Sequence, residues 1–185
     1  MNGRRKMNLV IITGMPGAGK GVLADAFREV NIPVIVMGDV IRNETKRRGL
    51  EPNPANTKKV MLELREKNGS GAVALCCIQD LVTTDSSTVV IEGCRSIAEI
   101  DVFDDYAQKT TIISVHASPS VRFQRLKDRA REDAPPEWDI FRERDLREIS
   151  VGLGGVIALS DIMVINESSI EEMQLKSRAI VKRFL

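Results

Sequence analysis

The 185-residue sequence has few aromatic residues, three cysteines, one histidine and no excess of charge of either sign. Its 27 Lys and Arg balance 26 Asp and Glu, and a net charge of +1 gives no general electrostatic argument for binding nucleic acid or a membrane surface. No apolar run approaches the length that spans a bilayer, and the N-terminus lacks the hydrophobic region of a secretory signal. We therefore expect a cytoplasmic protein that acts on neither nucleic acid nor membrane.

The scarce residue types also limit the chemistry. Cys76, Cys77 and Cys94 have no metal-type spacing and are odd in number, so we interpret them as reduced apolar residues. His116 has no orienting partner in the sequence, which favours a structural role, and Trp138 is expected to pack. With 4% aromatic residues, the core must consist of Val, Ile, Leu, Ala and Met. The length favours a single domain over residues 1–185.

The sequence does contain a glycine-rich segment, G-x-x-x-x-G-K, between an apolar run (Leu9–Thr13) and a helical pattern (Lys20–Val30). Glycines let the backbone curl so that N–H groups can face an anion, while the following helix dipole and Lys20 add positive charge. The strand and helix on either side disfavour a turn without function. We predict a site for ATP at Gly14, Met15, Pro16, Gly17, Ala18, Gly19, Lys20, Gly21 and Val22.

The segment lacks the Ser or Thr that usually follows the lysine and binds Mg²⁺, because Gly21 and Val22 stand there. The metal must then be held through water and a carboxylate elsewhere in the chain. Mg²⁺ suits such a site, since it gives up its water ligands reluctantly.

Short β-branched runs alternate with amphipathic stretches, which is typical of βαβ units and a parallel sheet. We expect strands at Leu9–Thr13, Val34–Met37, Thr88–Glu92, Thr111–His116 and Ile162–Ile165. We expect helices at Lys20–Val30, Asp39–Arg48, Asn56–Lys67, Ala72–Leu81, Ile97–Ala107, Ser120–Arg131, Trp138–Leu146 and Ile170–Arg183. The fold class is therefore α/β: a three-layer P-loop NTPase fold, with a five-stranded parallel sheet covered by helices on both faces. Two excursions interrupt the alternation, at about residues 38–68 and 127–143; in a kinase these would be a helical acceptor-binding arm and a short lid.

Charged side chains follow two of the predicted strands. Asp39 and Arg42 lie three residues apart after the second strand, where both side chains can face a ligand at the carboxyl end of the sheet. Alternatively, Asp39 is only a helix N-cap and Arg42 only forms a surface ion pair. Glu92 ends the third strand, where a carboxylate can reach Mg²⁺ through water or can simply be solvated. Arg95 follows it.

Three arginines, Arg122, Arg125 and Arg129, share one face of a predicted helix. Like charges on one stripe repel unless an anion or carboxylates neutralise them. The stripe is either a lid, with Arg125 and Arg129 closing over a triphosphate, or a charged surface helix. For Arg144 and Arg147 further along, catalysis and solvation both stay open.

These segments resemble the adenylate-kinase-like branch of P-loop kinases. Gly14–Gly21 is similar to the adenylate kinase form of the loop, Gly38-Asp39…Arg42 to a segment whose arginine grips the acceptor phosphate, and Glu92-Gly93…Arg95 to a second acceptor-binding segment. The stretch Ala158–Glu167 resembles the last strand of dephospho-coenzyme A kinases, which implies that Asn166 lies near the donor adenine. The chain also resembles a family of archaeal predicted nucleotide kinases related to dephospho-coenzyme A kinase.

The resemblance implies an ATP- and Mg²⁺-dependent phosphotransferase. Lys20, Asp39, Arg125 and Arg129 would be catalytic, Gly38, Asp39, Arg42 and Arg95 would bind the acceptor, and Glu92 would hold Mg²⁺ through water. The acceptor is a nucleoside monophosphate or dephospho-coenzyme A, and the second would require Asp39 as general base. A nucleotide-binding switch that hydrolyses ATP slowly is the alternative, and the balanced charge disfavours a nucleic-acid-processing ATPase. The sequence does not decide whether ATP or GTP is the preferred nucleotide, or whether the protein is a monomer or a homodimer.

Overall fold

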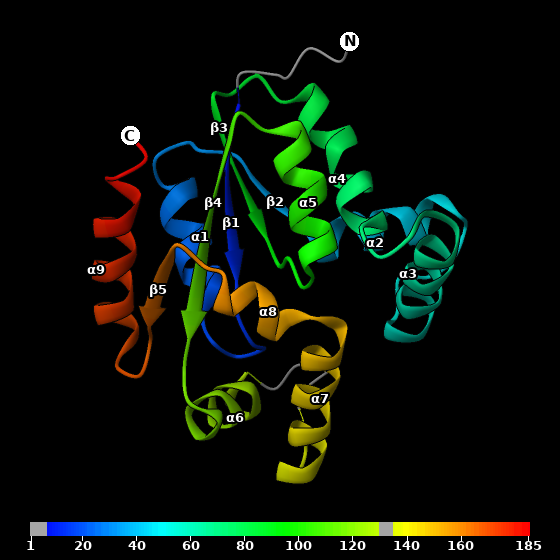
Figure 1. Ribbon diagram of the computed structural model, residues 1–185. Coiled ribbons are helices and arrows are strands. Elements are labelled where there is room, and N and C mark those ends of the chain that lie inside the picture. The colour runs from blue at the N-terminus through cyan, green and yellow to red at the C-terminus, as the bar shows by residue number, and fades with distance from the viewer. Residues whose placement is uncertain (1–6, 130–134) are drawn as a thin grey trace.

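The computed structural model describes residues 7–129 and 135–185, and its centre is one parallel sheet. The strand order is β2-β3-β1-β4-β5 (Figure 1). The strands are β1 (Asn8–Thr13), β2 (Val34–Val36), β3 (Thr88–Glu92), β4 (Lys109–His116) and β5 (Ile162–Ile165). The predicted fold class, with five parallel strands, is confirmed.

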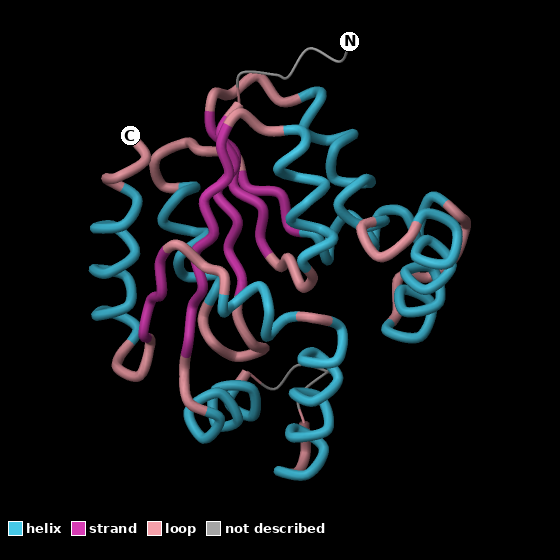
Figure 2. Tube along the Cα trace, in the orientation of Figure 1, coloured by secondary structure: helices cyan, strands magenta, loops and turns pink. Residues whose placement is uncertain are grey.

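Helices connect the strands and cover both faces of the sheet (Figure 2). They are α1 (Lys20–Arg28), α2 (Met37–Arg47), α3 (Pro54–Asn68), α4 (Ala72–Thr83), α5 (Ile97–Tyr106), α6 (Pro119–Asp128), α7 (Trp138–Val151), α8 (Leu153–Ala158) and α9 (Ile170–Val181). No helix in the described part of the chain combines the length and apolar character that crossing a bilayer requires.

The core has two layers because strand residues alternate between the faces of the sheet. On one face, Leu9 and Ile11 of β1 pack with α4 and α5 residues such as Cys77 and Phe103. On the other face, Val10 and Ile12 pack with α1 and α9 residues, among them Phe27 and Met173. The four consecutive apolar residues of β1, Leu9–Ile12, are thus explained by burial on both sides. Cys76, Cys77 and Cys94 are free thiols, as predicted.

Two predicted boundaries after β2 are wrong, and both matter for the site. Met37 begins α2 instead of ending β2, so Asp39 lies in the first turn of the helix and Val36 takes the N-cap position. The second is the start of the helix predicted at Asn56–Lys67, which begins two residues earlier, at Pro54. The Asn53 side chain accepts a hydrogen bond from the amide of Asn56 at 2.9 Å, so α3 begins at Pro54.

The region after Trp138 was predicted incompletely. Helix α7 continues to Val151, five residues beyond the predicted end, and ends at Gly152, whose φ is 117°. The short helix α8 that follows was not predicted. Helix α6 ends at Asp128, so the predicted lid at 127–143 overlaps the ends of two helices; residues 130–134 of that lid lie outside the described residues. The other predicted ends of helices differ by only a few residues.

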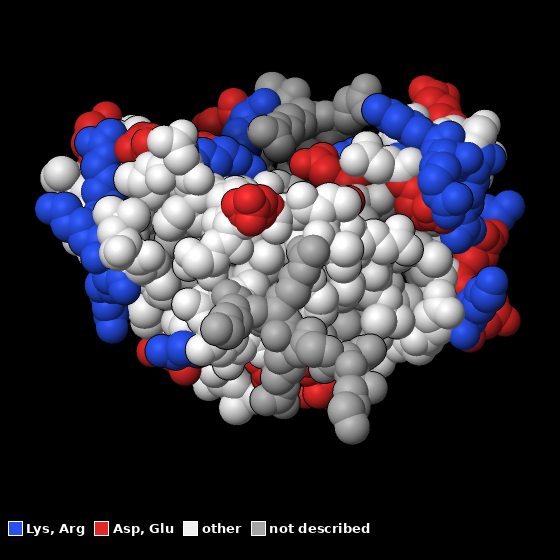
Figure 3. Space-filling view, turned by 90° about the horizontal axis from the view of Figure 1, so that it is seen from above, with Lys and Arg blue, Asp and Glu red and all other residues white. Residues whose placement is uncertain are grey.

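The two ends of the sheet differ. The carboxyl ends of the strands face α6, α7 and α8, and the α2–α3 arm projects to one side (Figure 1). Figure 3 shows the opposite end, where the Lys and Arg of the described residues lie mainly at the two sides, beside acidic residues. The charged residues that the sequence singled out belong to the carboxyl end of the sheet, where α/β proteins bind ligands.

Candidate functional site

The Gly14–Gly21 loop lies between β1 and α1 and is held by close neighbours. Gly14 has φ 142° and faces the Val115 carbonyl, so closely that an added Cβ would overlap its oxygen. Gly17 has φ 83°, and a Cβ there would lie 2.9 Å from the backbone oxygen of Arg122 in α6. Glycine is required at both positions, for its conformation and for its size. The loop is thus curled as a phosphate-binding loop must be, and it is braced by β4 and α6.

Lys20, the first residue of α1, has its ammonium group turned back along this loop. Its Nζ donates to the Gly14 carbonyl at 2.8 Å and to the Met15 carbonyl at 3.4 Å. Burial lowers the pKa of Lys20 from 10.5 to about 8. Smaller effects come from nearby charges: Glu92 and Glu148 raise the pKa, whereas Arg95 and Arg129 lower it further. An incoming polyphosphate would supply the negative charge that this buried ammonium lacks.

Glu92 ends β3, which neighbours β1, so its carboxylate lies beside the phosphate loop. Its backbone pairs with Ile12, and the next residue, Gly93, donates its N–H to the Ile12 carbonyl. Burial raises the pKa of Glu92, while the Lys20 ammonium acts in the opposite direction. A carboxylate here fits an Mg²⁺ ion that keeps most of its waters. In residues 7–129 and 135–185, no three His, Cys, Asp or Glu side chains form a metal-binding group, so a fully protein-ligated metal does not fit.

The predicted acceptor residues of the arm lie together on α2. The Asp39 carboxylate accepts hydrogen bonds from Arg42, from Nε at 3.0 Å and from the Nη2 group, and both side chains are about half exposed. The Arg42 guanidinium lies over Gly38. Asp39 also lies close enough to Glu92 for its charge to raise the pKa of that carboxyl. Hence Asp39 and Arg42 form a pair on α2, and because both hydrogen bonds use Oδ1, the second carboxylate oxygen, Oδ2, does not take part in them.

Arg95 follows β3 and is held at both its backbone and its side chain. Its amide donates to Glu99 Oε2 at 2.8 Å, and its Nη1 donates to Glu148 Oε1 of α7 at 3.2 Å. The side chain of Glu99 is 2% exposed and forms an ion pair with Arg65 of the arm helix α3 at 3.4 Å. Glu99 lies in the first turn of α5, and Ser96 is the N-cap of that helix. The S-x-x-E spacing of Ser96 and Glu99 is a capping signal that would have located this buried acid in the sequence.

The three arginines of α6 have different environments, although they share one face. Arg122 is buried: it forms a bidentate pair with Asp145 of α7, at 2.8 and 2.5 Å, and donates to the Pro16 carbonyl at 3.2 Å. It therefore ties the phosphate loop to α7, and Asp145 supplies the neutralising charge. Arg129 is exposed at the end of α6, near enough to Lys20 to lower its pKa.

Arg125 is held by the loop after β5. It donates to the Asn166 carbonyl at 3.0 Å, to Asn166 Oδ1 at 3.3 Å and to the Ser168 carbonyl at 3.1 Å. Asn166 in turn donates from Nδ2 to the Ala18 carbonyl at 2.8 Å, so the predicted adenine-side residue contacts the phosphate loop directly. Arg125 thus braces the loop after β5, and its predicted role as a lid residue stays a prediction.

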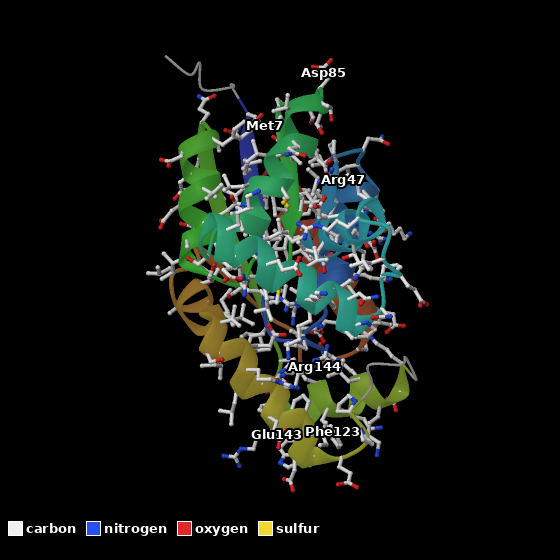
Figure 4. The ribbon with its side chains drawn as sticks, turned by 90° about the vertical axis from the view of Figure 1, so that its right-hand side faces the viewer. Met7, Arg47, Asp85, Phe123, Glu143 and Arg144 are labelled. Carbon is white, nitrogen blue, oxygen red and sulfur yellow. The ribbon has the colours of Figure 1, made fainter. Side chains whose placement is uncertain are left out.

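Helix α7 contributes two acids that the sequence analysis missed, Asp145 and Glu148. They lie three residues apart, so they share the face of α7 that meets the site. Trp138, at the start of α7, packs against Phe123 and Phe141 with ring centroids 5.3 and 5.2 Å away, as predicted. In Figure 4, Arg144 lies toward α3, whereas Glu143 and Phe123 lie toward the lower end of the molecule. The His116 side chain is exposed at the end of β4, and its structural role stays a prediction.

A P-loop domain with a kinase-like fold is the class of protein that this sheet order and loop define. The AAA domain family matches residues 13–140. The chain belongs to this family and to the UPF0200 proteins. It is 43% identical to the UPF0200 protein of Hyperthermus butylicus, covering 99% of this chain and 97% of the relative. It is 44% identical to that of Methanocaldococcus jannaschii, covering 90% and 85%.

Solved structures share the fold at low sequence identity. A shikimate kinase from Bacteroides thetaiotaomicron gives a TM-score of 0.62 at 18% identity, covering 96% of each chain. A gluconokinase from Sinorhizobium meliloti gives a TM-score of 0.55 at 14% identity, covering 98% of this chain and 95% of the other. TT1252 from Thermus thermophilus gives a TM-score of 0.65 at 16% identity, covering 97% of this chain and 98% of the other. At such identities the likeness establishes the fold alone.

Proposed function

We propose that the protein is an ATP-dependent phosphotransferase acting on a nucleotide-type small molecule, a nucleoside monophosphate or dephospho-coenzyme A. The observation that carries the proposal is the pairing of a lysine-bearing phosphate loop with a second group of arginines, Arg42 and Arg95, at the same end of the sheet. A protein that only binds or hydrolyses ATP has no need of the second group. Two of the similar folds belong to a shikimate kinase and a gluconokinase, which agrees with this class of reaction.

Each part of the site has a role in phosphoryl transfer, which depends mainly on positioning and charge neutralisation. The loop residues Gly14–Gly21 and Val22 would hold the triphosphate, with Lys20 between the β- and γ-phosphates. Asn166 would set the loop after β5 against the phosphate loop. Arg129 would neutralise charge on the transferring group, and Arg125 would do so only after releasing Asn166 and Ser168.

Mg²⁺ fits this site through Glu92 and water, since Gly21 and Val22 offer no hydroxyl. When bound, the ion would neutralise phosphate oxygens. Arg42 and Arg95 would fix the acceptor's anionic group. A monophosphate acceptor attacks through its own phosphate oxygen and needs no base, whereas a hydroxyl acceptor needs Asp39 to take the proton, through the oxygen that Arg42 does not use.

The test is ADP release by the purified protein with ATP and Mg²⁺, alone and with each of a panel of mononucleotides and dephospho-coenzyme A. We expect one acceptor to raise the rate well above the acceptor-free value, and Lys20→Ala to remove that rate. Turnover that is equal with and without every acceptor would instead support a nucleotide-dependent switch, the function favoured by the missing hydroxyl at Gly21 and Val22. No nucleic acid or membrane partner is proposed.

A further inference from the structure

Arg95 leaves the sheet directly beside the start of the phosphate loop. The amide of Gly93 donates to the Ile12 carbonyl at 2.9 Å, and the Thr13 hydroxyl donates to the Cys94 carbonyl at 2.8 Å. The two residues before Arg95 are thus hydrogen-bonded to the last two residues of β1. The phosphate loop also begins directly after β1, so the two segments leave the sheet side by side.

The side chain of Arg95 extends to α7, the helix that is tied to the phosphate loop. Its Nη1 donates to Glu148 Oε1 at 3.2 Å. One turn earlier on α7, Asp145 holds Arg122, which donates to the Pro16 carbonyl of the loop at 3.2 Å. The Arg95 guanidinium therefore lies between the end of β1 and a helix anchored on the loop, within reach of a ligand that the loop holds.

The charges of the site agree with this position. The positive charge of Arg95 lowers the pKa of Lys20, and its effect is larger than that of Arg129. Because a Coulomb interaction weakens with distance, a cation that acts on the Lys20 ammonium also acts on a phosphate group bound to it. Arg95 is therefore placed to stabilise negative charge on that phosphate at least as strongly as Arg129.

The Arg95 guanidinium is also available to a ligand. Its side chain is 49% exposed, and Glu148 takes one of the five N–H donors that a guanidinium carries. Arg125, in contrast, already donates to Asn166 and Ser168. An anion can therefore bind to Arg95 without breaking its bond to Glu148.

We propose that Arg95 is a catalytic residue that donates hydrogen bonds to the γ-phosphate of the bound nucleotide, and does not serve the acceptor alone. During transfer, the bond from the γ-phosphorus to the β–γ bridging oxygen breaks, its electron pair leaves with ADP, and an acceptor oxygen bonds to the phosphorus. The guanidinium stabilises the negative charge on the γ-phosphate oxygens during this step. The inference rests on the proposed function for the statement that the loop holds ATP, but it requires no particular acceptor.

Nucleotide affinities test the contact without any acceptor. A residue that contacts the γ-phosphate strengthens the binding of ATP but not of ADP. Calorimetry with Mg²⁺ would measure the dissociation constants (Kd) of ADP and of the β,γ-imido analogue of ATP, which is not hydrolysed. The proteins compared are the wild type, Arg95→Ala and the control Arg47→Ala. The control removes an arginine charge from the exposed side of α2, where Arg47 pairs with Glu44.

We expect Arg95→Ala to weaken binding of the ATP analogue about tenfold, the factor that a charge-assisted hydrogen bond commonly supplies, and to change the Kd of ADP by less than about twofold. Arg47→Ala should leave both affinities unchanged. A merely structural role of Arg95 would weaken both nucleotides alike.

Affinities that fall equally for the two nucleotides in Arg95→Ala, or that do not change, would overturn the proposal. If the wild type binds neither nucleotide, this proposal and the proposed function both fail. If the loss is specific to the ATP analogue but no acceptor is phosphorylated, the proposed function fails and the role of Arg95 stands.

Discussion

Replacement of Lys20 by methionine should abolish nucleotide binding and yet make the ligand-free protein more stable. The pKa of Lys20 falls from 10.5 to about 8 because the ammonium is buried. At about 1.4 kcal/mol per tenfold change, holding that charge costs up to about 3 kcal/mol. Methionine removes this cost, but it also removes the hydrogen bonds to Gly14 and Met15, worth about 1 kcal/mol each. We expect a net gain of about 1–2 kcal/mol at pH 7, which raises the Tm by about 2–8 °C.

The pH dependence of that gain is the sharper test. Between about pH 8 and 10.5 the folded protein has released the Lys20 proton and the unfolded chain has not, so the wild type becomes more stable as pH rises. The advantage of Lys20→Met should therefore shrink through this window and be lost by its upper end. Thermal unfolding from pH 7 to 10.5 would follow it, with exposed Lys59→Met as the matched control. A lower Tm for Lys20→Met at pH 7, or a gap that does not change with pH, would refute the reasoning.

Three further changes test other parts of the site. Asp145→Asn should lower stability by about 3 kcal/mol in urea unfolding, because it leaves the buried Arg122 charge unpaired; a loss below about 1 kcal/mol would contradict this. Asn166→Ala should raise the KM for ATP about tenfold by freeing the loop after β5 from Ala18, and an unchanged KM would argue against that contact. Arg42→Ala should raise the acceptor KM about tenfold with little change for ATP; an unchanged acceptor KM would remove Arg42 from the pocket.

The sheet and the phosphate loop could be predicted from the sequence because their signals are local. Strand β1 is apolar at consecutive positions since both its faces are buried, and the G-x-x-x-x-G-K spacing directly marks the turn into α1. The boundaries after β2 were less predictable. The strand has only three residues, and the helix follows without a polar cap, so neither pattern marks the boundary.

The partners of the charged residues could not be predicted, because they depend on contacts between distant segments. Arg122, Arg125 and Arg129 look equivalent on a helical face, but α7 buries the first and the loop after β5 holds the second. Asp145 and Glu148 belong to the site because α7 packs beside the phosphate loop, a contact between distant segments. The helix predicted from the sequence ended at Leu146, so Glu148 lay beyond it.

The most direct test of the account is the fate of the γ-phosphate. With ATP labelled at that position, Mg²⁺ and the acceptor that gives the highest ADP release, the account predicts label in the acceptor, in amounts equal to the ADP formed, and no label transferred by Lys20→Ala. Label recovered only as inorganic phosphate, at a rate that no acceptor changes, would contradict it.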